Sequence, residues 1–152
     1  MQSAFKCYSQ LMKFRLSATV VFSALIGYLL GTENPNFSEI LLLVFGGILV
    51  TGSANALNQI LERNYDKLMK RTAKRPLPAG NLTLSQALIF SFIIGIIGLY
   101  FLLLINLQCS FFGLLSMLLY VLVYTPLKRV SAFSVFIGAF PGAIPVLLGW
   151  VA

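Results

Sequence analysis

Apolar residues run through the chain in long blocks that short polar segments separate. Five blocks are evident, at about 14–31, 38–57, 84–105, 109–125 and 131–152. Each is long enough to cross the hydrocarbon core of a bilayer as a helix, which takes about 17–25 apolar residues. The blocks are continuously apolar instead of alternating, which favours helices over the strands of a membrane barrel. The pattern therefore predicts an all-α fold, a polytopic transmembrane helical bundle with about five membrane spans.

Capping residues and prolines mark where some of these helices begin and end. Thr83 and Gln86 have the spacing of a capping box at the start of the third span. The second span is expected to continue as a helix into the charged segment that follows it, until Pro76 and Pro78 stop that helix.

Glycines and prolines inside the spans predict local packing and shape. Gly27–Gly31 and Gly138–Gly142 have GxxxG spacing, which is typical of closely packed membrane helices. Pro141 and Pro145 are expected to bend the fifth helix.

Composition and charge agree with a membrane protein and predict its orientation. The 152 residues are 59% hydrophobic and 10% charged, with a net charge of +7. With five spans, all eleven lysines and arginines fall on one side of the membrane. The positive-inside rule then places the N-terminus and the charged loops in the cytoplasm, and we expect an integral protein of a bacterial inner membrane. The charge needs no nucleic acid partner.

The cysteines and the absence of histidine narrow the chemistry. The chain has no histidine, which removes histidine acid–base catalysis and histidine ligation of zinc or haem iron from it. Cys7 and Cys109 are far apart and form no CxxC motif, so they are interpreted as small residues without a special role.

Polar residues recur at helical spacing just after the second block. Asn58, Glu62 and Asp66 are each four residues apart, and Asn55 lies three residues before Asn58. These positions share one face of a helix, in a stripe about 16 Å long at 1.5 Å per residue. A cluster of five cations follows, namely Lys67, Lys70, Arg71, Lys74 and Arg75.

The stripe suggests a metal site beside a phosphate site. Glu62 and Asp66 repel each other at this spacing, and a carboxylate at membrane depth costs about 2.5–3.5 kcal/mol. Mg²⁺, which binds one or two carboxylates together with water and phosphate, would offset both costs. Arg71 and Arg75 would hold the phosphate. A polyprenyl diphosphate combines a diphosphate with an apolar chain; the alternative is that the cations only obey the positive-inside rule.

A second polar cluster ends the fourth block on the same side of the membrane. Tyr124, Lys128 and Arg129 lie in the segment YTPLKR. They could help to hold the diphosphate. The alternative is an interfacial anchor, made of a belt tyrosine with snorkelling cations.

Together these two motifs resemble those of the UbiA-type intramembrane prenyltransferases. The first is Asn58, Glu62 and Asp66 followed by the segment RTAKRPL at 71–77, and the second is Tyr124 with Lys128. The resemblance implies a helical fold of about nine helices around a central cavity. It implies that Asn58, Glu62 and Asp66 bind Mg²⁺ and diphosphate, and that Glu62, Asp66 and Tyr124 act in catalysis. Diphosphate charge would be steadied by Asn58, Arg71, Arg75 and Lys128.

Within this superfamily the chain resembles the haem O synthase branch, the protohaem IX farnesyltransferases. Gln59 and Glu62 in the first motif, and the segment IGAFPGAIPVLLGW at 137–150, carry this closer likeness. It implies that a farnesyl group passes from farnesyl diphosphate to a vinyl group of haem B, giving haem O. The alternatives are a quinone-ring or chlorophyll-type acceptor, or, in another class, a small membrane transporter or structural subunit.

The resemblance also predicts that residues 1–152 are the N-terminal half of a single prenyltransferase domain. The family has a second acidic motif in its latter half, whereas all four acids of this chain precede residue 67. We therefore expect the remaining C-terminal half of the same chain to complete the site, and residues 1–152 alone to be inactive.

Overall fold

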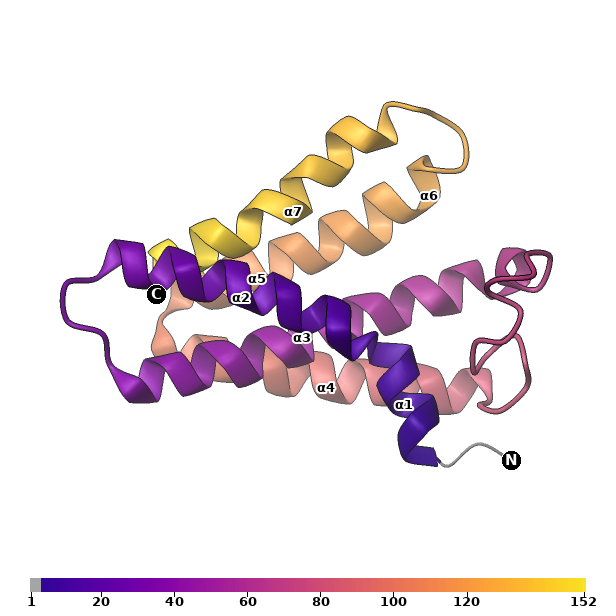
Figure 1. Cartoon of the computed structure of the whole chain (residues 1–152), viewed down its shortest axis with the longest axis horizontal. Helices are drawn as coiled ribbons and strands as arrows, with labels where there is room; N and C mark the ends of the chain where they lie inside the picture. The colour runs from indigo at the N-terminus through magenta and orange to yellow at the C-terminus, as the bar shows by residue number, and fades with distance from the viewer. Residues whose placement is uncertain (1–3) are drawn as a thin grey trace.

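Helices account for most of residues 4–152, the part of the chain that this computed structural model describes, and no strand occurs among those residues (Figure 1). In order they are α1 (Ala4–Met12), α2 (Phe14–Gly31), α3 (Phe37–Asp66), α4 (Leu84–Ile105), α5 (Leu107–Leu118), the π-helix η1 (Leu119–Tyr124), α6 (Thr125–Leu127) and α7 (Ser134–Trp150). The predicted all-α class is confirmed.

Four helical stretches are long and apolar enough to cross a membrane. They are α2, α3, α4 and the continuous stretch Leu107–Leu127, while α7 is apolar but has only 17 residues. The expectation of about five spans agrees with these five stretches. The predicted capping box is confirmed, because the Thr83 hydroxyl accepts from Gln86 N–H and the Gln86 side chain accepts from Thr83 N–H.

The end of α3 differs from the prediction. The helix ends at Asp66, so the expectation that Pro76 and Pro78 stop it is wrong. The segment from Lys67 to Leu82 forms successive turns instead, and the Thr72 hydroxyl donates to the Asp66 carbonyl at 2.9 Å. This bond satisfies one of the carbonyls that a helix end leaves without a partner.

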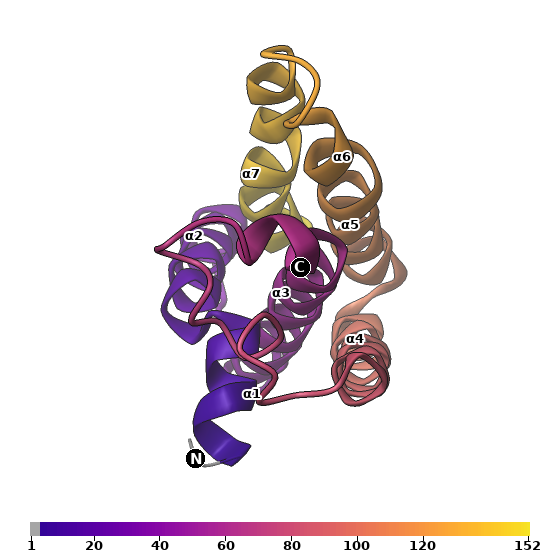
Figure 2. The ribbon, with the colours of Figure 1, turned by 90° about the vertical axis from the view of Figure 1, so that its right-hand side faces the viewer.

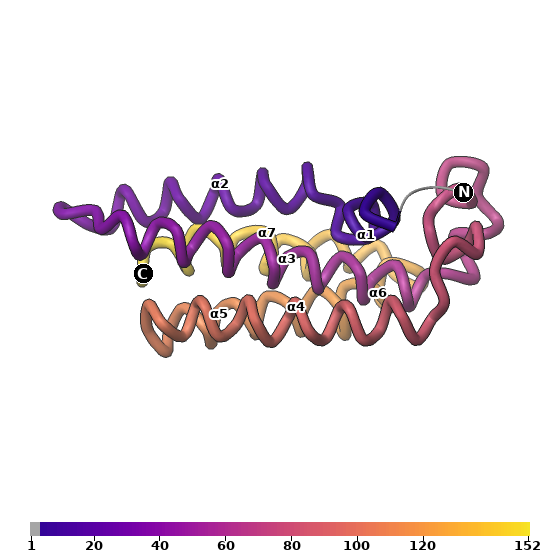
Figure 3. The backbone as a smooth tube through the Cα atoms, turned by 90° about the horizontal axis from the view of Figure 1, so that it is seen from below, coloured from indigo at the N-terminus to yellow at the C-terminus, as the bar shows by residue number. Residues whose placement is uncertain are grey.

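The long helix α3 lies between α2 and α4, while α7 packs on α2 and α5 (Figures 2 and 3). Small residues bring these helices close together. A Cβ added to Gly98 would lie 2.8 Å from Val50 N, and one added to Gly31 would lie 2.8 Å from the Trp150 carbonyl oxygen. The predicted packing role is wrong for Gly142, because nothing lies within 4 Å of an added Cβ there.

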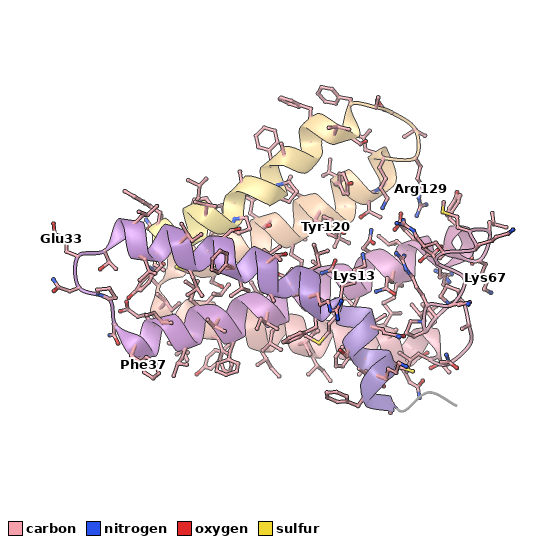
Figure 4. The ribbon with its side chains drawn as sticks, in the orientation of Figure 1. Lys13, Glu33, Phe37, Lys67, Tyr120 and Arg129 are labelled. Carbon is pink, nitrogen blue, oxygen red and sulfur yellow. The ribbon has the colours of Figure 1, made fainter. Side chains whose placement is uncertain are left out.

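The two ends of the bundle differ in charge. Lys13, Lys67 and Arg129 lie toward one end, and Glu33 lies at the other (Figure 4). The segments between α1 and α2, α3 and α4, and α6 and α7 share the first end (Figure 1). The cations are therefore gathered at one end of the helices.

Candidate functional site

A cavity of about 840 Å³ lies among α2, α3, the α5–α6 stretch and α7. This volume is within the range of pockets that hold small molecules. Aliphatic residues line most of its length, and polar residues gather at the cationic end. All of the predicted site residues line it, namely Asn58, Glu62, Asp66, Arg71, Arg75, Tyr124 and Lys128.

The predicted stripe of α3 faces this cavity along its whole length. Asn55, Asn58, Glu62 and Asp66 all line it. Asn55 has a packing role, because its amide donates to the Met12 carbonyl at 3.3 Å and to the Ser17 hydroxyl at 3.4 Å. The remaining three residues form the polar wall of the site.

Each carboxylate of the stripe pairs with a cation from another element. Arg75 Nη1 lies 2.7 Å from Asp66 Oδ2, and Lys128 Nζ lies 2.7 Å from Glu62 Oε1. The side chains of Asp66 and Glu62 are only 7% and 13% exposed. Since a buried carboxylate without a partner is strongly unfavourable, these pairs let two like charges sit four residues apart on one helix.

Two further cations line the cavity without a carboxylate. Among residues 4–152, neither Lys13 nor Arg71 makes an ion pair. Together with Arg75 and Lys128, they bring the number of cations at the polar end to four. Only two carboxylates among the described residues oppose them there. An excess of positive charge at the end of an apolar cavity suits a hydrophobic anion.

The sequence analysis missed Lys13 as a site residue. Lys13 separates α1 from α2 with a left-handed backbone, φ 50°, which is the only positive φ outside glycine among the described residues. Burial is the main cause that lowers the pKa of its ammonium group, and the nearby Arg75 and Lys128 lower it further. No residue spacing around Lys13 indicates its left-handed backbone or its place in the cavity, so the sequence pattern could not identify it as a site residue.

Tyr120 is a second residue that the sequence analysis missed. It lines the cavity, and its ring stacks on that of Tyr124 with centroids 5.5 Å apart. Lys128 Nζ lies 5.6 Å from the centroid of the Tyr124 ring. The predicted tyrosine is thus one of a pair beside the ion pair of Glu62.

The donor set fits Mg²⁺. Among residues 4–152, no group of three or more His, Cys, Asp or Glu side chains could hold a metal. Mg²⁺ does not need one, because it takes one or two carboxylates and fills its shell with water and phosphate oxygens. Glu62 and Asp66 could supply the carboxylates. The amide nitrogen of Asn58 is committed to Thr125, which leaves the amide oxygen for a ligand.

The structure is thus a bundle of helices long enough to cross a membrane, with a cavity that is apolar along its length and polar at one end. The chain belongs to the UbiA prenyltransferase family, whose model matches residues 20–152.

Individual relatives agree with this assignment. A protein of Christiangramia forsetii named protoheme IX farnesyltransferase is 48% identical over 145 residues, covering 95% of this chain and 48% of the relative. A chain from a structural study of digeranylgeranylglyceryl phosphate synthase in membranes superposes with a TM-score of 0.86 at 27% identity, covering 97% of this chain and 52% of that one.

A UbiA homologue of Archaeoglobus fulgidus, solved with DMAPP and Mg²⁺, has a TM-score of 0.85 at 17% identity, covering 95% of this chain and 53% of that one. This likeness concerns the fold. The chain spans about half the length of each of these proteins.

Proposed function

We propose that the complete protein containing this chain transfers a farnesyl group from farnesyl diphosphate to a vinyl group of haem B, making haem O in a Mg²⁺-dependent reaction. The observation that carries the proposal is a pair of carboxylates, the buried Asp66 and the half-buried Glu62, at the cationic end of an apolar cavity. The name of the C. forsetii relative supports haem as the acceptor. The A. fulgidus structure supports Mg²⁺ with a prenyl diphosphate.

In this proposal the polar end holds the diphosphate and the apolar length holds the farnesyl chain. Asn58, Glu62 and Asp66 would bind Mg²⁺, which stabilises negative charge on the leaving group when it is bound. Arg71, Arg75 and Lys128 would bind the diphosphate oxygens.

The proposed reaction needs positive charge near the carbon–oxygen bond that breaks. Departure of the allyl group concentrates negative charge on the bridging oxygen of the diphosphate, and fixed cations stabilise that charge in the transition state. Tyr124 would lie beside the reacting allyl carbon, since it borders the cavity next to Lys128.

The test is a haem extract. Membranes that contain the complete protein, supplied with haem B, farnesyl diphosphate and Mg²⁺, are expected to yield haem O, resolved by chromatography and mass. A prenylated quinone with no haem O would contradict the acceptor. We further propose that residues 1–152 alone are inactive, because the remaining C-terminal half of the domain supplies a second acidic motif; haem O from this segment alone would contradict that.

We also propose that the protein lies in a bacterial inner membrane with its cationic end in the cytoplasm, in accord with the positive-inside rule. Cysteines introduced at Asn34 and Lys74, in a background without Cys7 and Cys109, are expected to react with impermeant reagents from opposite faces. Labelling of both from one face would contradict this orientation.

A further inference from the structure

The last turns of the α5–α6 stretch are wider than an α-helix. Residues Leu119–Tyr124 form the π-helix η1, and Pro126 follows two residues later. Proline has no N–H to donate and its ring clashes with the carbonyl four residues earlier, so a widened turn relieves both problems. Such π-segments are rare and often occur at functional sites.

One hydroxyl group joins this wide turn to α3. The Tyr120 carbonyl accepts from both the backbone N–H and the hydroxyl of Thr125, the latter at 2.8 Å. The same hydroxyl accepts from Asn58 Nδ2, also at 2.8 Å. Thr125 and Asn58 are 0% and 1% exposed, so water does not compete for these bonds.

These bonds decide which way the Asn58 amide faces. A hydroxyl has one proton, and that of Thr125 is committed to the Tyr120 carbonyl. Only its lone pairs are left for Asn58, so the side chain of Asn58 must present its NH₂ group to Thr125. The amide oxygen then takes the opposite position, away from Thr125, on a residue that lines the cavity.

We propose that Thr125 is a positioning residue of the metal and diphosphate site, which acts by holding the Asn58 amide with its oxygen available to the ligand. The inference rests on the proposed function, because it takes Mg²⁺ with a prenyl diphosphate as that ligand. Thr125 itself is absent from the residues that line the cavity, so its effect passes through Asn58.

A purely structural role makes a different prediction. If Thr125 only fastened η1 to α3, its loss would lower the stability of the bundle and leave the dependence on Mg²⁺ unchanged. Ser53 supplies the matched case, because its buried hydroxyl also joins two helices, donating to the Ser91 carbonyl at 2.8 Å, and it does not line the cavity.

The experiment compares Thr125→Val, Thr125→Ser and Ser53→Ala in the complete protein in lipid nanodiscs. The measurements are the Mg²⁺ concentration that gives half-maximal binding of farnesyl thiodiphosphate, a slowly reacting donor analogue, and the thermal midpoint of the ligand-free protein. Loss of a group that orients a metal ligand typically costs about 10–100-fold in affinity. We expect Thr125→Val to raise the half-maximal Mg²⁺ concentration about tenfold or more.

Thr125→Ser keeps the hydroxyl that orients Asn58. Its half-maximal Mg²⁺ concentration is therefore expected to stay within about twofold of the wild-type value. Ser53→Ala is expected to lower the thermal midpoint without moving the Mg²⁺ dependence. A folded Thr125→Val protein with wild-type Mg²⁺ dependence would overturn the inference, and so would an equal shift in Ser53→Ala.

A fourth variant covers failure of Thr125→Val to fold. Thr125→Cys keeps a weak donor and acceptor of similar size, and it is expected to need more Mg²⁺ than Thr125→Ser; equal values for the two would overturn the inference. Wild-type protein without any Mg²⁺-dependent binding would overturn the proposed function, and this inference with it.

Discussion

Helix α3 carries an acid near each of its ends, and the two ends satisfy their acids in different ways. Glu39 lies in the first turn, where the positive end of the helix dipole favours a carboxylate. Its Oε2 accepts from the Tyr28 hydroxyl at 2.6 Å. Tyr28 also accepts from the Asn36 backbone N–H at 2.9 Å. A neutral hydroxyl from α2 thus satisfies the carboxylate at this end, and neither of these two bonds involves a cation.

At the other end the dipole works against the acids. Asp66 is the last residue of α3, and Glu62 lies one turn before it. The negative end of a helix disfavours carboxylates, so each takes a cation from another segment, Arg75 or Lys128. Acids that the helix dipole disfavours, and that pair with cations instead of a neutral hydroxyl, are the ones that a metal ion and an anionic ligand could take over together. Glu39 is therefore structural, and the C-terminal pair is suited to binding.

Among the variants that test this comparison, removal of the Asp66 carboxylate should have the largest effect on diphosphate binding and turnover. Loss of an outer partner already costs about 10–100-fold in metal affinity, so Asp66→Ala is expected to weaken Mg²⁺-dependent diphosphate binding at least about 100-fold and to abolish turnover of the complete protein. Membrane insertion should persist. The matched control is Glu39→Gln, which keeps an acceptor for Tyr28 and should bind diphosphate as the wild type does. Similar losses in both variants would remove the distinction between the ends.

Disruption of the Glu39 end should change stability and leave binding unaffected in the folded fraction. A Cβ on Gly149 would lie 2.8 Å from Tyr28 N and closer still to the Ala24 carbonyl. Overpacking typically costs about 1–3 kcal/mol, so Gly149→Val is expected to lower the thermal midpoint by several degrees. Gly142→Ala, with open space around it, is the control for stability. An unchanged midpoint for Gly149→Val would contradict the close packing of α2 on α7.

Removal of one cation from the other end should have a moderate effect. Hydrogen bonds to charged groups are worth about 1.5–3 kcal/mol, so Lys128→Met is expected to weaken diphosphate binding about tenfold. Lys67→Met is the control, because Lys67 is exposed and does not line the cavity. Binding is measured by titration calorimetry at two salt concentrations, because salt screens the attraction of exposed charges. Equal weakening in both variants would show that only the total charge matters.

Replacement of Lys13 should have the smallest effect on diphosphate binding. Its contribution is measured best as the pH dependence of stability. Its lowered pKa means that the charged form costs the folded state stability. The unfolded chain binds more protons between that lowered pKa and the ordinary value of 10.5, so stability should rise with pH through this window. Lys13→Met is expected to remove this rise, measured as the thermal midpoint against pH, and to weaken diphosphate binding only about twofold to fourfold. A rise that survives in Lys13→Met would assign it to another group.

Local patterns along the chain account for what the sequence could predict. The apolar blocks predicted the helices, and Thr83 with Gln86 predicted the start of α4. The spacing of four residues predicted that Glu62 and Asp66 share one face of α3. Each of these depends only on neighbouring residues. The predicted end of α3 was wrong because the Thr72 hydroxyl satisfies the backbone carbonyl of Asp66, so the helix can end well before the prolines.

Features that depend on distant residues could not be predicted. The partner of Glu62 is 66 positions away in sequence, at Lys128, and the partner of Asn58 is Thr125. Helical periodicity fixes a face but not what packs against it. The widened turn before Pro126 has no periodicity signal at all, because the same residues would also fit an α-helix that ends there.

The two ion pairs make occupation of the cavity a matter of thermodynamic linkage. A metal ion alone would have to detach Arg75 and Lys128 from Asp66 and Glu62, leaving those cations without counterions in a partly buried site. A diphosphate alone would compete with the two carboxylates for the same cations. If both were bound, the carboxylates of Asp66 and Glu62 would be available to the metal, and Arg75 and Lys128 to the phosphate oxygens, so that each ligand would raise the affinity for the other. By reciprocity, the factor by which Mg²⁺ tightens the diphosphate equals the factor by which the diphosphate tightens Mg²⁺.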